Sequence, residues 1–543
     1  MKRSAWRPTT AFFVAVLGAC LAGCSPTETS QPSTRGVVYC SESDPTSFNP
    51  QLDTSGTTSD ASAHQLYDRL IEFDIETGNI VAGLAESWLV SEDGLVYTFQ
   101  LKKNVAFHHT DYFSPSRTFN ADDVLFSINR WRDESHPYHT ISGGMYPYFQ
   151  SLNLAANIES VDRINGYRIQ IHLTKPDSSF LAHLATDFAV ILSAEYADEL
   201  LKQGRPEALD HYPIGTGPYR FVEYRKNRFI RYERHDNYWR HSVPNPQLVF
   251  DITQRSALRL AKLITGECDV SAFPAQSELN AVREDDRLTL LEKPGLNVGF
   301  WAFNTQREPF DNPDVRRALA MAIDKSTLLD AVYFGSAKRA IGIVPPTSWA
   351  HQQNAEEISY NPVQSRSLLR AMGVEQGFSM TIWAMPVQRA YNPNAMKMAK
   401  LMQGYLAAVG VEVTIVSYDW TTFRNNLQAG MHDSVLIGWS ADNADPDNFY
   451  RPLLTCGAIP SGTNRAMWCN QKYDNLIERA IAVTDSDQRK QLYAQANRLL
   501  YEQVPLLPIA HAFRYQAQRE NIKKVIINSY GGIQLGEVEK RDD

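Results

Sequence analysis

Residues 378–450 read FSMTIWAMPVQRAYNPNAMKMAKLMQGYLAAVGVEVTIVSYDWTTFRNNLQAGMHDSVLIGWSADNADPDNFY, and this stretch decides the fold. Three of its runs, FSMTIWA, VEVTIVSY and SVLIGW, have the alternation or the β-branched content of strands. Apolar residues recur at helical spacing from Met398 to Val409, where Gly410 ends the pattern, and a shorter helix is expected over 420–428. The order strand–helix–strand–helix–strand predicts an α/β domain with a parallel sheet and right-handed crossovers.

Two charged residues follow strands of this predicted sheet. Arg389 lies just after the first strand, and Asp442 lies just after the third. Ligands of open α/β sheets bind beyond the carboxyl ends of the strands. A guanidinium can hold a carboxylate through two hydrogen bonds, and a carboxylate can hold an ammonium, so a short zwitterionic peptide would fit between them. The alternative is that both are ordinary surface charges, or that they pair with each other.

Composition narrows the class of protein. The 543 residues correspond to roughly three or four domains, and a hydrophobic content of 43% is ample for sizeable cores. The formal net charge is -8 and there is no basic run, which argues against nucleic-acid binding. After the first residues no apolar segment reaches 18 residues, so a role in transport would require another protein to form the channel.

The N-terminus has the pattern of a secretory signal. A basic start, MKRSAWR, precedes the apolar run AFFVAVLGACLAG, which is too short to span a bilayer as a helix. The run ends in Leu21-Ala22-Gly23-Cys24, which resembles a bacterial lipoprotein processing box. We therefore expect residues 1–23 to be a lipoprotein signal peptide, Cys24 to carry the lipid, and residues 24–35 to be a polar tether. The alternative is an ordinary signal peptide cut elsewhere.

The remaining cysteines are even in number, as is typical of disulfides in exported proteins. With Cys24 lipidated, four are left: Cys40, Cys268, Cys456 and Cys469. Cys456 and Cys469 close a short loop and are expected to pair, which leaves Cys40 to pair with Cys268. The alternative is a zinc site with four thiolates, although no CxxC spacing supports it.

Other segments complete the predicted architecture. A strand is expected over 36–40, a Thr/Ser/Gly loop over 54–58 and a helix over 61–70. Gly56 permits close approach of a ligand to the backbone, and the neighbouring hydroxyls can bond it, although a simple Ser/Thr turn is the alternative. Residues 75–190 show alternating strands and a helix capped by Asn120, which is typical of an inserted α+β module. His108 and His109 would point to opposite faces of a strand, so no metal site is predicted.

Several motifs together resemble the extracytoplasmic solute-binding proteins of peptide ABC transporters, the oligopeptide/dipeptide-binding family also called family 5. The resemblance covers almost the whole chain after the signal and is carried by LAESW…DGLVYTFQLKKNVAFH, FNADDVLFS, PIGTGPY, FNT…PFDNPDVRRALAMAID and GWSADNADPDNFY. Within the family, WAMPVQRAYNPN and the cysteine spacings resemble the dipeptide-binding branch. HHTDYFSPSRTFNADDV and NFYRPLL resemble the Sap peptide-binding branch.

The resemblance implies a fold and a site. The fold would be a two-lobed periplasmic binding protein fold with an additional inserted domain: domain I over 36–75, 191–293 and 509–540, inserted domain II over 76–190, and domain III over 294–508. Asp442 would hold a ligand's α-ammonium and Arg389 its α-carboxylate. The family positions that line the pocket correspond here to Tyr391, Trp439, Thr54, Ser55, Gly56 and Thr57. No catalytic residue, metal or cofactor is implied.

The implied function is peptide capture for uptake, with a permease and an ATPase as partners. The protein would be a monomer held by its lipid at the envelope of a Gram-negative cell, facing the periplasm. The Sap resemblance extends the candidate ligands from di- and oligopeptides to cationic antimicrobial peptides. Two alternatives stay open: a binder of haem or another non-peptide ligand with the same fold, and a secreted hydrolase. The hydrolase has little support, because neither GxSxG nor HExxH occurs.

Overall fold

The computed structural model describes residues 36–74, 77–373, 378–530 and 532–541. The predictions for the signal peptide, Cys24 and the tether therefore lie outside the described residues. Within the described ranges, no helix has both the length and the apolar character that a membrane span needs.

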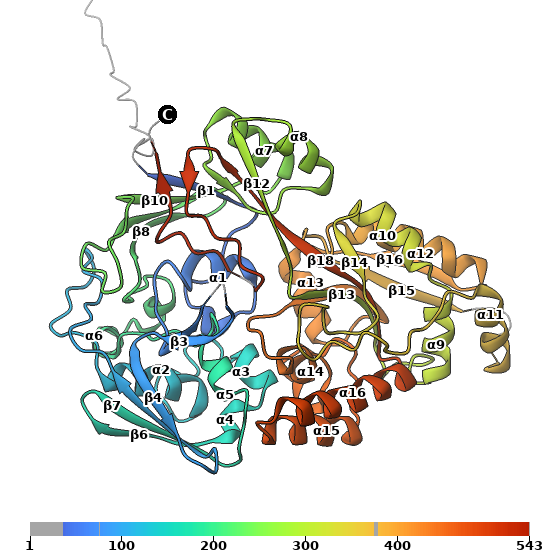
Figure 1. The fold of residues 1–543 in the computed structure, drawn as a ribbon, viewed down its shortest axis with the longest axis horizontal. Helices are drawn as coiled ribbons and strands as arrows, with labels where there is room; N and C mark the ends of the chain where they lie inside the picture. The colour runs from blue at the N-terminus through green and yellow to red at the C-terminus, as the bar shows by residue number, and fades with distance from the viewer. Residues whose placement is uncertain (1–35, 75–76, 374–377, 531, 542–543) are drawn as a thin grey trace, which may run out of the picture. The chain divides into compact units, whose positions relative to one another are not determined.

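The described chain is a mixture of helices and strands, as predicted for an α/β fold (Figure 1). The strands are β1 (Val37–Ser41), β2 (Ile71–Phe73), β3 (Ile80–Ala82), β4 (Ala85–Val90), β5 (Val96–Leu101), β6 (Ile158–Asn165), β7 (Arg168–Leu173), β8 (Tyr219–Arg225), β9 (Phe229–Arg234), β10 (Gln247–Ile252), β11 (Val270–Ser271), β12 (Leu288–Pro294), β13 (Asn297–Phe303), β14 (Ala337–Arg339), β15 (Ser379–Ala384), β16 (Glu412–Val416), β17 (Ser434–Ser440), β18 (Leu506–Arg519), β19 (Ile522–Lys523) and β20 (Glu539–Lys540).

Helices of two kinds connect these strands. The α-helices are α1 (Gly56–Ser62), α2 (Ala121–Arg132), α3 (Pro147–Ser151), α4 (Leu154–Asn157), α5 (Phe180–Leu184), α6 (Ala194–Lys202), α7 (Ser256–Thr265), α8 (Leu279–Arg283), α9 (Pro313–Met321), α10 (Lys325–Tyr333), α11 (Pro362–Ala371), α12 (Ala395–Ala408), α13 (Trp420–Gln428), α14 (Asp447–Leu454), α15 (Gln471–Ala482) and α16 (Ser486–Gln503). The 3-10 helices are η1 (Pro50–Leu52), η2 (Pro206–Asp210), η3 (Gln276–Glu278) and η4 (Cys456–Ala458).

The stretch that decides the fold forms the predicted elements. Strands β15, β16 and β17 alternate with α12 and α13, and β15 pairs in parallel with both β16 and β17. The residues that bury α12 against the sheet include Met398, Met402 and Leu406, which the helical spacing had placed on one face. The parallel arrangement is thus confirmed, and the loops after β15 and β17 begin at the same end of the sheet.

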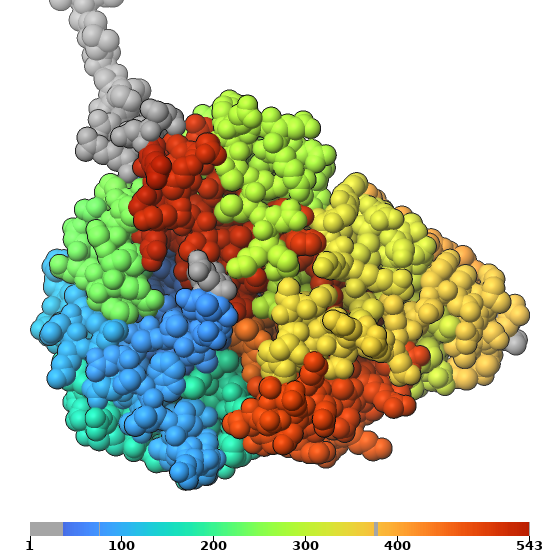
Figure 2. Space-filling model, in the orientation of Figure 1, coloured from blue at the N-terminus to red at the C-terminus, as the bar shows by residue number. Residues whose placement is uncertain are grey.

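One long strand, β18, connects the two parts of the large sheet, whose strands follow the order β16-β15-β17-β13-β18-β11-β1-β10-β9-β8. Its first half pairs with β13 and β14, and its second half pairs with β11 and β12. In Figure 2 the red C-terminal segment lies beside the green segment near residues 250–290, in agreement with the β12–β18 pairing. Because β12 leads directly into β13, the chain passes between the two parts here as well.

A cluster of hydrogen bonds holds these two crossings together. The Asn297 side chain donates from Nδ2 to the Ala512 carbonyl at 2.8 Å and accepts at Oδ1 from the Ala512 backbone N–H at 2.9 Å. The backbone N–H of Gly295 donates to the same Ala512 carbonyl at 3.2 Å. A Cβ atom on residue 295 would lie 2.1 Å from Asn297 Nδ2 and 2.7 Å from that carbonyl oxygen, so only glycine fits.

The buried apolar side chains form two large clusters. One draws its members from Val37 to Ala272 and from Ile522 to Val538, and the other from Leu296 to Tyr530. The first cluster includes the antiparallel sheet β4-β5-β7-β6, which packs with α2. Asn120 caps α2 as predicted, with Asp123 completing a capping box.

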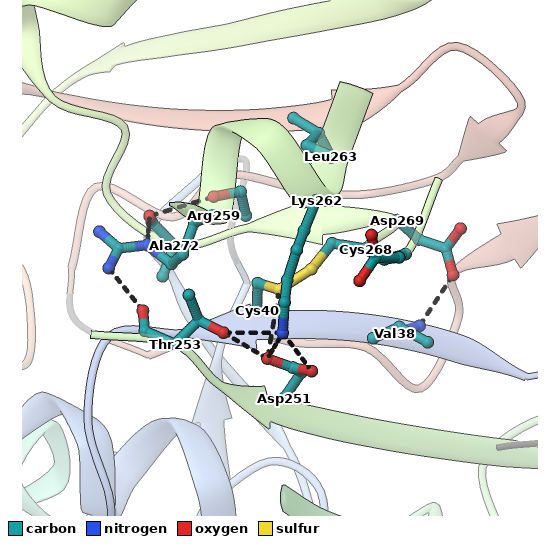
Figure 3. Close-up of a disulfide and its surroundings, with 12 residues drawn as sticks. Val38, Cys40, Asp251, Thr253, Arg259, Lys262, Leu263, Cys268, Asp269 and Ala272 are labelled. Atoms are coloured by element: carbon teal, nitrogen blue, oxygen red, sulfur yellow. Dashed lines mark hydrogen bonds and ion pairs between the residues drawn. A yellow bond between two sulfur atoms is a disulfide. The ribbon is translucent and has the colours of Figure 1, made fainter. Parts of the chain in front are cut away.

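The two predicted disulfides are present, which rules out the zinc alternative for these four cysteines. Cys40 and Cys268 are bonded with their Cα atoms 5.9 Å apart, and Cys456 and Cys469 with theirs 4.4 Å apart. Figure 3 shows the first bond beneath helix α7. Beside it the Lys262 ammonium donates to both carboxylate oxygens of Asp251, at 2.7 and 2.8 Å. This charged pair joins α7 to β10, and the disulfide joins β1 to the turn that follows α7.

The helix predicted over 61–70 is wrong in position. Helix α1 begins at Gly56 and ends at Ser62, so the predicted loop over 54–58 includes the start of the helix. Asp53 explains the earlier start: its carboxylate accepts hydrogen bonds from the Ser55 backbone N–H at 3.1 Å and from the Thr58 hydroxyl at 3.1 Å. The Asp53 carboxylate thus lies at the N-terminal end of α1, where the helix dipole favours negative charge.

We predict that Gly295→Ala destabilises the protein by about 1–3 kcal/mol, because the added methyl displaces Asn297 and opens the cluster at the two crossings. Thermal unfolding followed by circular dichroism measures the change. Gly342→Ala is the matched control, since its Cβ would meet nothing within 4 Å. Equal melting temperatures for the two variants would contradict the role given to this cluster.

Candidate functional site

A cavity of about 140 Å³ brings together most of the residues predicted to bind a ligand. Seven of the eight predicted residues line it, and they come from segments far apart in the chain: Thr54, Ser55, Gly56, Arg389, Tyr391, Trp439 and Asp442. Thr57 does not line the cavity; its side chain is buried, and its hydroxyl lies 3.4 Å from that of Ser55. A larger cavity of about 650 Å³ lies between residues 325–358 and 490–508 and contains none of the predicted residues.

The loop after β15 positions Arg389 and Tyr391. Arg389 and Asn392 exchange two backbone hydrogen bonds, at 3.2 and 3.1 Å, which close a tight turn. The Tyr333 hydroxyl donates to the Tyr391 carbonyl at 2.7 Å. This carbonyl also lies where a Cβ on Gly299 would be, so the loop lies directly on strand β13. The turn therefore presents its side chains into the cavity from a fixed backbone.

The loop after β17 positions Asp442. Its backbone N–H donates to Asn448 Oδ1 at 3.1 Å, and the same oxygen accepts from the Trp439 indole at 3.0 Å. The carboxylate oxygen Oδ2 of Asp442 is shielded from solvent and has no hydrogen-bond partner among the described residues. Burial, and then the negative charge of Asp187, raise the pKa of Asp442 well above its ordinary value.

Arg389 pairs with a residue that the sequence did not indicate. Its Nη1 atom lies 3.2 Å from Glu42 Oε1 and 3.0 Å from the Gln388 carbonyl, and its guanidinium lies over the Trp420 ring at 5.5 Å. Within the described residues no ion pair joins Arg389 to Asp442, so the alternative that they pair with each other is wrong.

Two further guanidiniums line the same side of the cavity. Arg424, on α13, forms an ion pair with Asp53 at 2.6 Å. Arg465 lies in the loop between Cys456 and Cys469. Sequence patterns gave no sign of either, although Trp420 and Arg424 are four residues apart on the predicted helix and therefore share a face.

Most charges of the cavity are separated by sign, although Arg514 has Asp60 and Asp187 as charged neighbours. Burial raises the pKa of Tyr391, and the guanidiniums of Arg389, Arg465 and Arg424 oppose this rise, so all three lie near its ring. Asp442 instead has Asp187 as its charged neighbour, and Asp187 pairs with His64 at 2.7 Å. Burial, and then Glu42, raise the pKa of Asp60, another lining residue, to about 8. A ligand with an ammonium at one end and a carboxylate at the other matches this separation.

Comparison with known proteins identifies the family. The sequence profile described as "Bacterial extracellular solute-binding proteins, family 5 Middle" matches residues 79–461. The chain belongs to family 5 of the bacterial extracellular solute-binding proteins. Family membership bears out the resemblance found in the sequence.

Similarity to individual relatives extends over nearly the whole chain. The dipeptide-binding protein of Escherichia coli K12 is 44% identical over 91% of this chain and 92% of its own. The peptide transport periplasmic protein SapA of Salmonella typhimurium is 42% identical over 96% and 95%. The heme-binding protein A of Haemophilus influenzae is 41% identical over 93% and 92%. Similarity to both the dipeptide-binding and the Sap branches agrees with the motifs.

A solved structure shows the same fold with a ligand. The crystal structure of the dipeptide binding protein from Pseudoalteromonas sp. SM9913 in complex with Met-Leu is 46% identical, covering 93% of this chain and all of that chain, with a TM-score of 0.91. The architecture of this family 5 protein is therefore that of periplasmic binding proteins, as predicted.

We predict that Asp442→Asn stabilises the ligand-free protein at pH 8, raising its melting temperature by about 1–3 °C. The folded-state pKa of Asp442 lies above its unfolded value, so ionisation costs stability once the pH exceeds the unfolded pKa, and the cost grows as the pH rises. The gain from asparagine should therefore vanish near pH 4. Differential scanning fluorimetry across this pH range measures it.

Asp445→Asn is the matched control for this substitution. Asp445 accepts two hydrogen bonds from Arg489, at 2.8 and 2.7 Å, so its carboxylate is compensated where that of Asp442 is not. The control should lose stability at pH 8. A loss of stability in Asp442→Asn at pH 8 would show that the Asp442 carboxylate is satisfied in the empty protein.

Proposed function

We propose that this protein is the substrate-binding component of a peptide ABC transporter and that it captures short peptides in the cavity between Asp442 and Arg389. The observation that carries the proposal is the Asp442 oxygen that is shielded from water and lacks a partner among the described residues, in a cavity that is also lined by a group of guanidiniums near Tyr391. Because an uncompensated buried charge is costly, such an oxygen is expected where a ligand ammonium completes the site.

The expected contacts can supply the binding free energy of a micromolar complex. A hydrogen bond to a charged group contributes roughly 1.5–3 kcal/mol net, and a micromolar complex needs about 8 kcal/mol. Hydrogen bonds to the ammonium and to the carboxylate of a zwitterion would supply a large share of this binding free energy. The hydroxyls and backbone of Thr54, Ser55 and Gly56, and the rings of Tyr391 and Trp439, would contribute the rest without selecting one sequence.

Capture requires the cavity to open, and we propose that two lobes move about the crossings at Gly295–Asn297 and Ala512. Lobe one would comprise domain I (36–75, 191–293 and 509–540) with inserted domain II (76–190), and domain III (294–508) would be lobe two. Ion pairs join residues of the two across the cavity, namely Arg389 with Glu42 and Arg424 with Asp53. These pairs would form on closure and exclude water from the ligand.

Delivery requires partners that the chain does not supply. The similarity to SapA and to dipeptide-binding proteins supports a permease and an ATPase as those partners. The motif at Cys24 supports a lipid anchor and a place in the periplasm. Similarity to the Sap branch also keeps cationic antimicrobial peptides among the ligands to be tested.

A haem ligand is the second candidate, because one relative is named a heme-binding protein. The chemistry of the cavity argues against it. Its lining contains no histidine, cysteine or methionine that could bind iron, although it does contain Tyr391. A hydrolase is disfavoured by the family, whose members bind solutes.

We predict that native mass spectrometry of freshly purified protein shows small peptide masses. In isothermal titration calorimetry, N-acetylation of a dipeptide such as Ala-Leu should weaken binding at least tenfold, because it removes the ammonium that Asp442 would hold. Asp442→Asn should abolish the difference between the free and the acetylated peptide. Equal affinities in the wild type, or co-purified haem without peptide, would overturn the proposal.

A further inference from the structure

Of the three guanidiniums near Tyr391, that of Arg465 has no counter-ion among the described residues. Arg465 lines the cavity, and within the described residues it forms no ion pair and no side-chain hydrogen bond, although the Cys456–Cys469 loop that carries it is fully described. Burial, and then the neighbouring Arg424 guanidinium, lower the pKa of Arg465 to about 9. It remains charged at neutral pH, and its surroundings oppose that charge.

The two other guanidiniums near Tyr391 already have partners, whereas Arg514, which also lines the cavity, has Asp60 and Asp187 as charged neighbours. Arg389 has Glu42 at 3.2 Å, and Arg424 has Asp53 at 2.6 Å. Burial tends to raise the pKa of Asp53, but Arg424 and the hydroxyls of Ser55 and Thr46 hold this pKa below its ordinary value. Asp53 is therefore ionised at neutral pH. Three positive and two negative charges thus meet on this side of the cavity. The net charge on this side is one positive unit, located near Arg465, and a negatively charged group of a ligand would balance it.

The backbone of Arg465 is held in place. Its carbonyl accepts a hydrogen bond from His432 Nε2 at 2.8 Å, and the next residue, Ala466, accepts one from the Thr305 backbone N–H at 2.9 Å. Inside the loop, Asn464 donates to the carbonyls of Thr455 and Trp468 at 3.0 and 2.8 Å. The Cys456–Cys469 disulfide closes the loop. A side chain mounted on so constrained a loop is suited to positioning a ligand.

We propose that Arg465 binds the carboxylate of the peptide and supplies more of the electrostatic attraction than Arg389 does. The proposal rests on the proposed function and adds a ligand-binding residue to it. Arg389 then has two roles, since it faces the same carboxylate while its charge is met by Glu42 of the opposite wall. A single carboxylate balances the charges around Tyr391, as a single ammonium does at Asp442. The pocket therefore fits a peptide with uncharged side chains.

The test combines variants with a change in the ligand. Affinities for Ala-Leu and for its C-terminal amide are measured by calorimetry, and their ratio isolates the contribution of the carboxylate. In the wild type the amide should bind at least tenfold more weakly. Arg465→Gln should reduce this ratio to within about threefold of one, and Arg389→Gln should reduce it by a smaller factor. Because the ratio is formed within each variant, a general loss of stability cancels.

Controls and outcomes separate the two proposals. Arg228→Gln, at an exposed arginine away from the cavity, should leave the ratio unchanged. Arg465→Lys should restore part of it. If the wild type prefers the free carboxylate but Arg465→Gln keeps that preference, Arg465 is not a ligand residue and the proposed function stands. If the wild type binds neither peptide, both proposals fail.

Discussion

The arrangement of charged side chains around the cavity depends on the free-energy cost of removing a charge from water. Four acidic and four basic side chains line one cavity of about 140 Å³. Half of them form an ion pair inside the protein: Asp187 pairs with His64, Arg389 with Glu42, and Arg424 with Asp53. Asp60 and Arg514 interact electrostatically without a direct ion pair. Among the described residues, Asp442 has a shielded oxygen without a partner near Asp187, and Arg465 has no counter-ion near Tyr391. A cavity built only for stability would pair such groups with each other, so their separation points to a ligand that carries both charges.

The sequence revealed those parts of the structure that depend on neighbouring residues. Periodicity located β15, α12, β16, α13 and β17, and their order established the parallel sheet. Arg389 and Asp442 directly follow β15 and β17. Because parallel strands end at the same edge of a sheet, the sequence was sufficient to predict that the two residues line one cavity. Family motifs then added Tyr391, Trp439 and residues 54–57, of which Thr57 does not line the cavity.

Other features could not be predicted, because they depend on contacts between distant segments. Glu42 and Arg389 are 347 positions apart in the chain, and Asp53 and Arg424 are 371 apart. Arg465 lies in a loop with no strand or helix pattern to orient it. The helix expected over 61–70 was misplaced for a local reason, because the role of Asp53 in starting α1 was not recognised. Ion pairs between distant segments cannot be predicted from sequence patterns, because only the folded chain brings their partners together.

The unpaired oxygen of Asp442 has a consequence for the conditions under which the protein works. When the cavity is empty, burial raises the pKa of Asp442 and so favours its neutral form over the anion. An incoming amine and a hydrogen ion therefore compete for the same atom. Each loading event would return hydrogen ions to the surroundings, and acidification would make loading harder without altering the fold. Loading of the proposed receptor would therefore depend on external acidity as well as on peptide concentration.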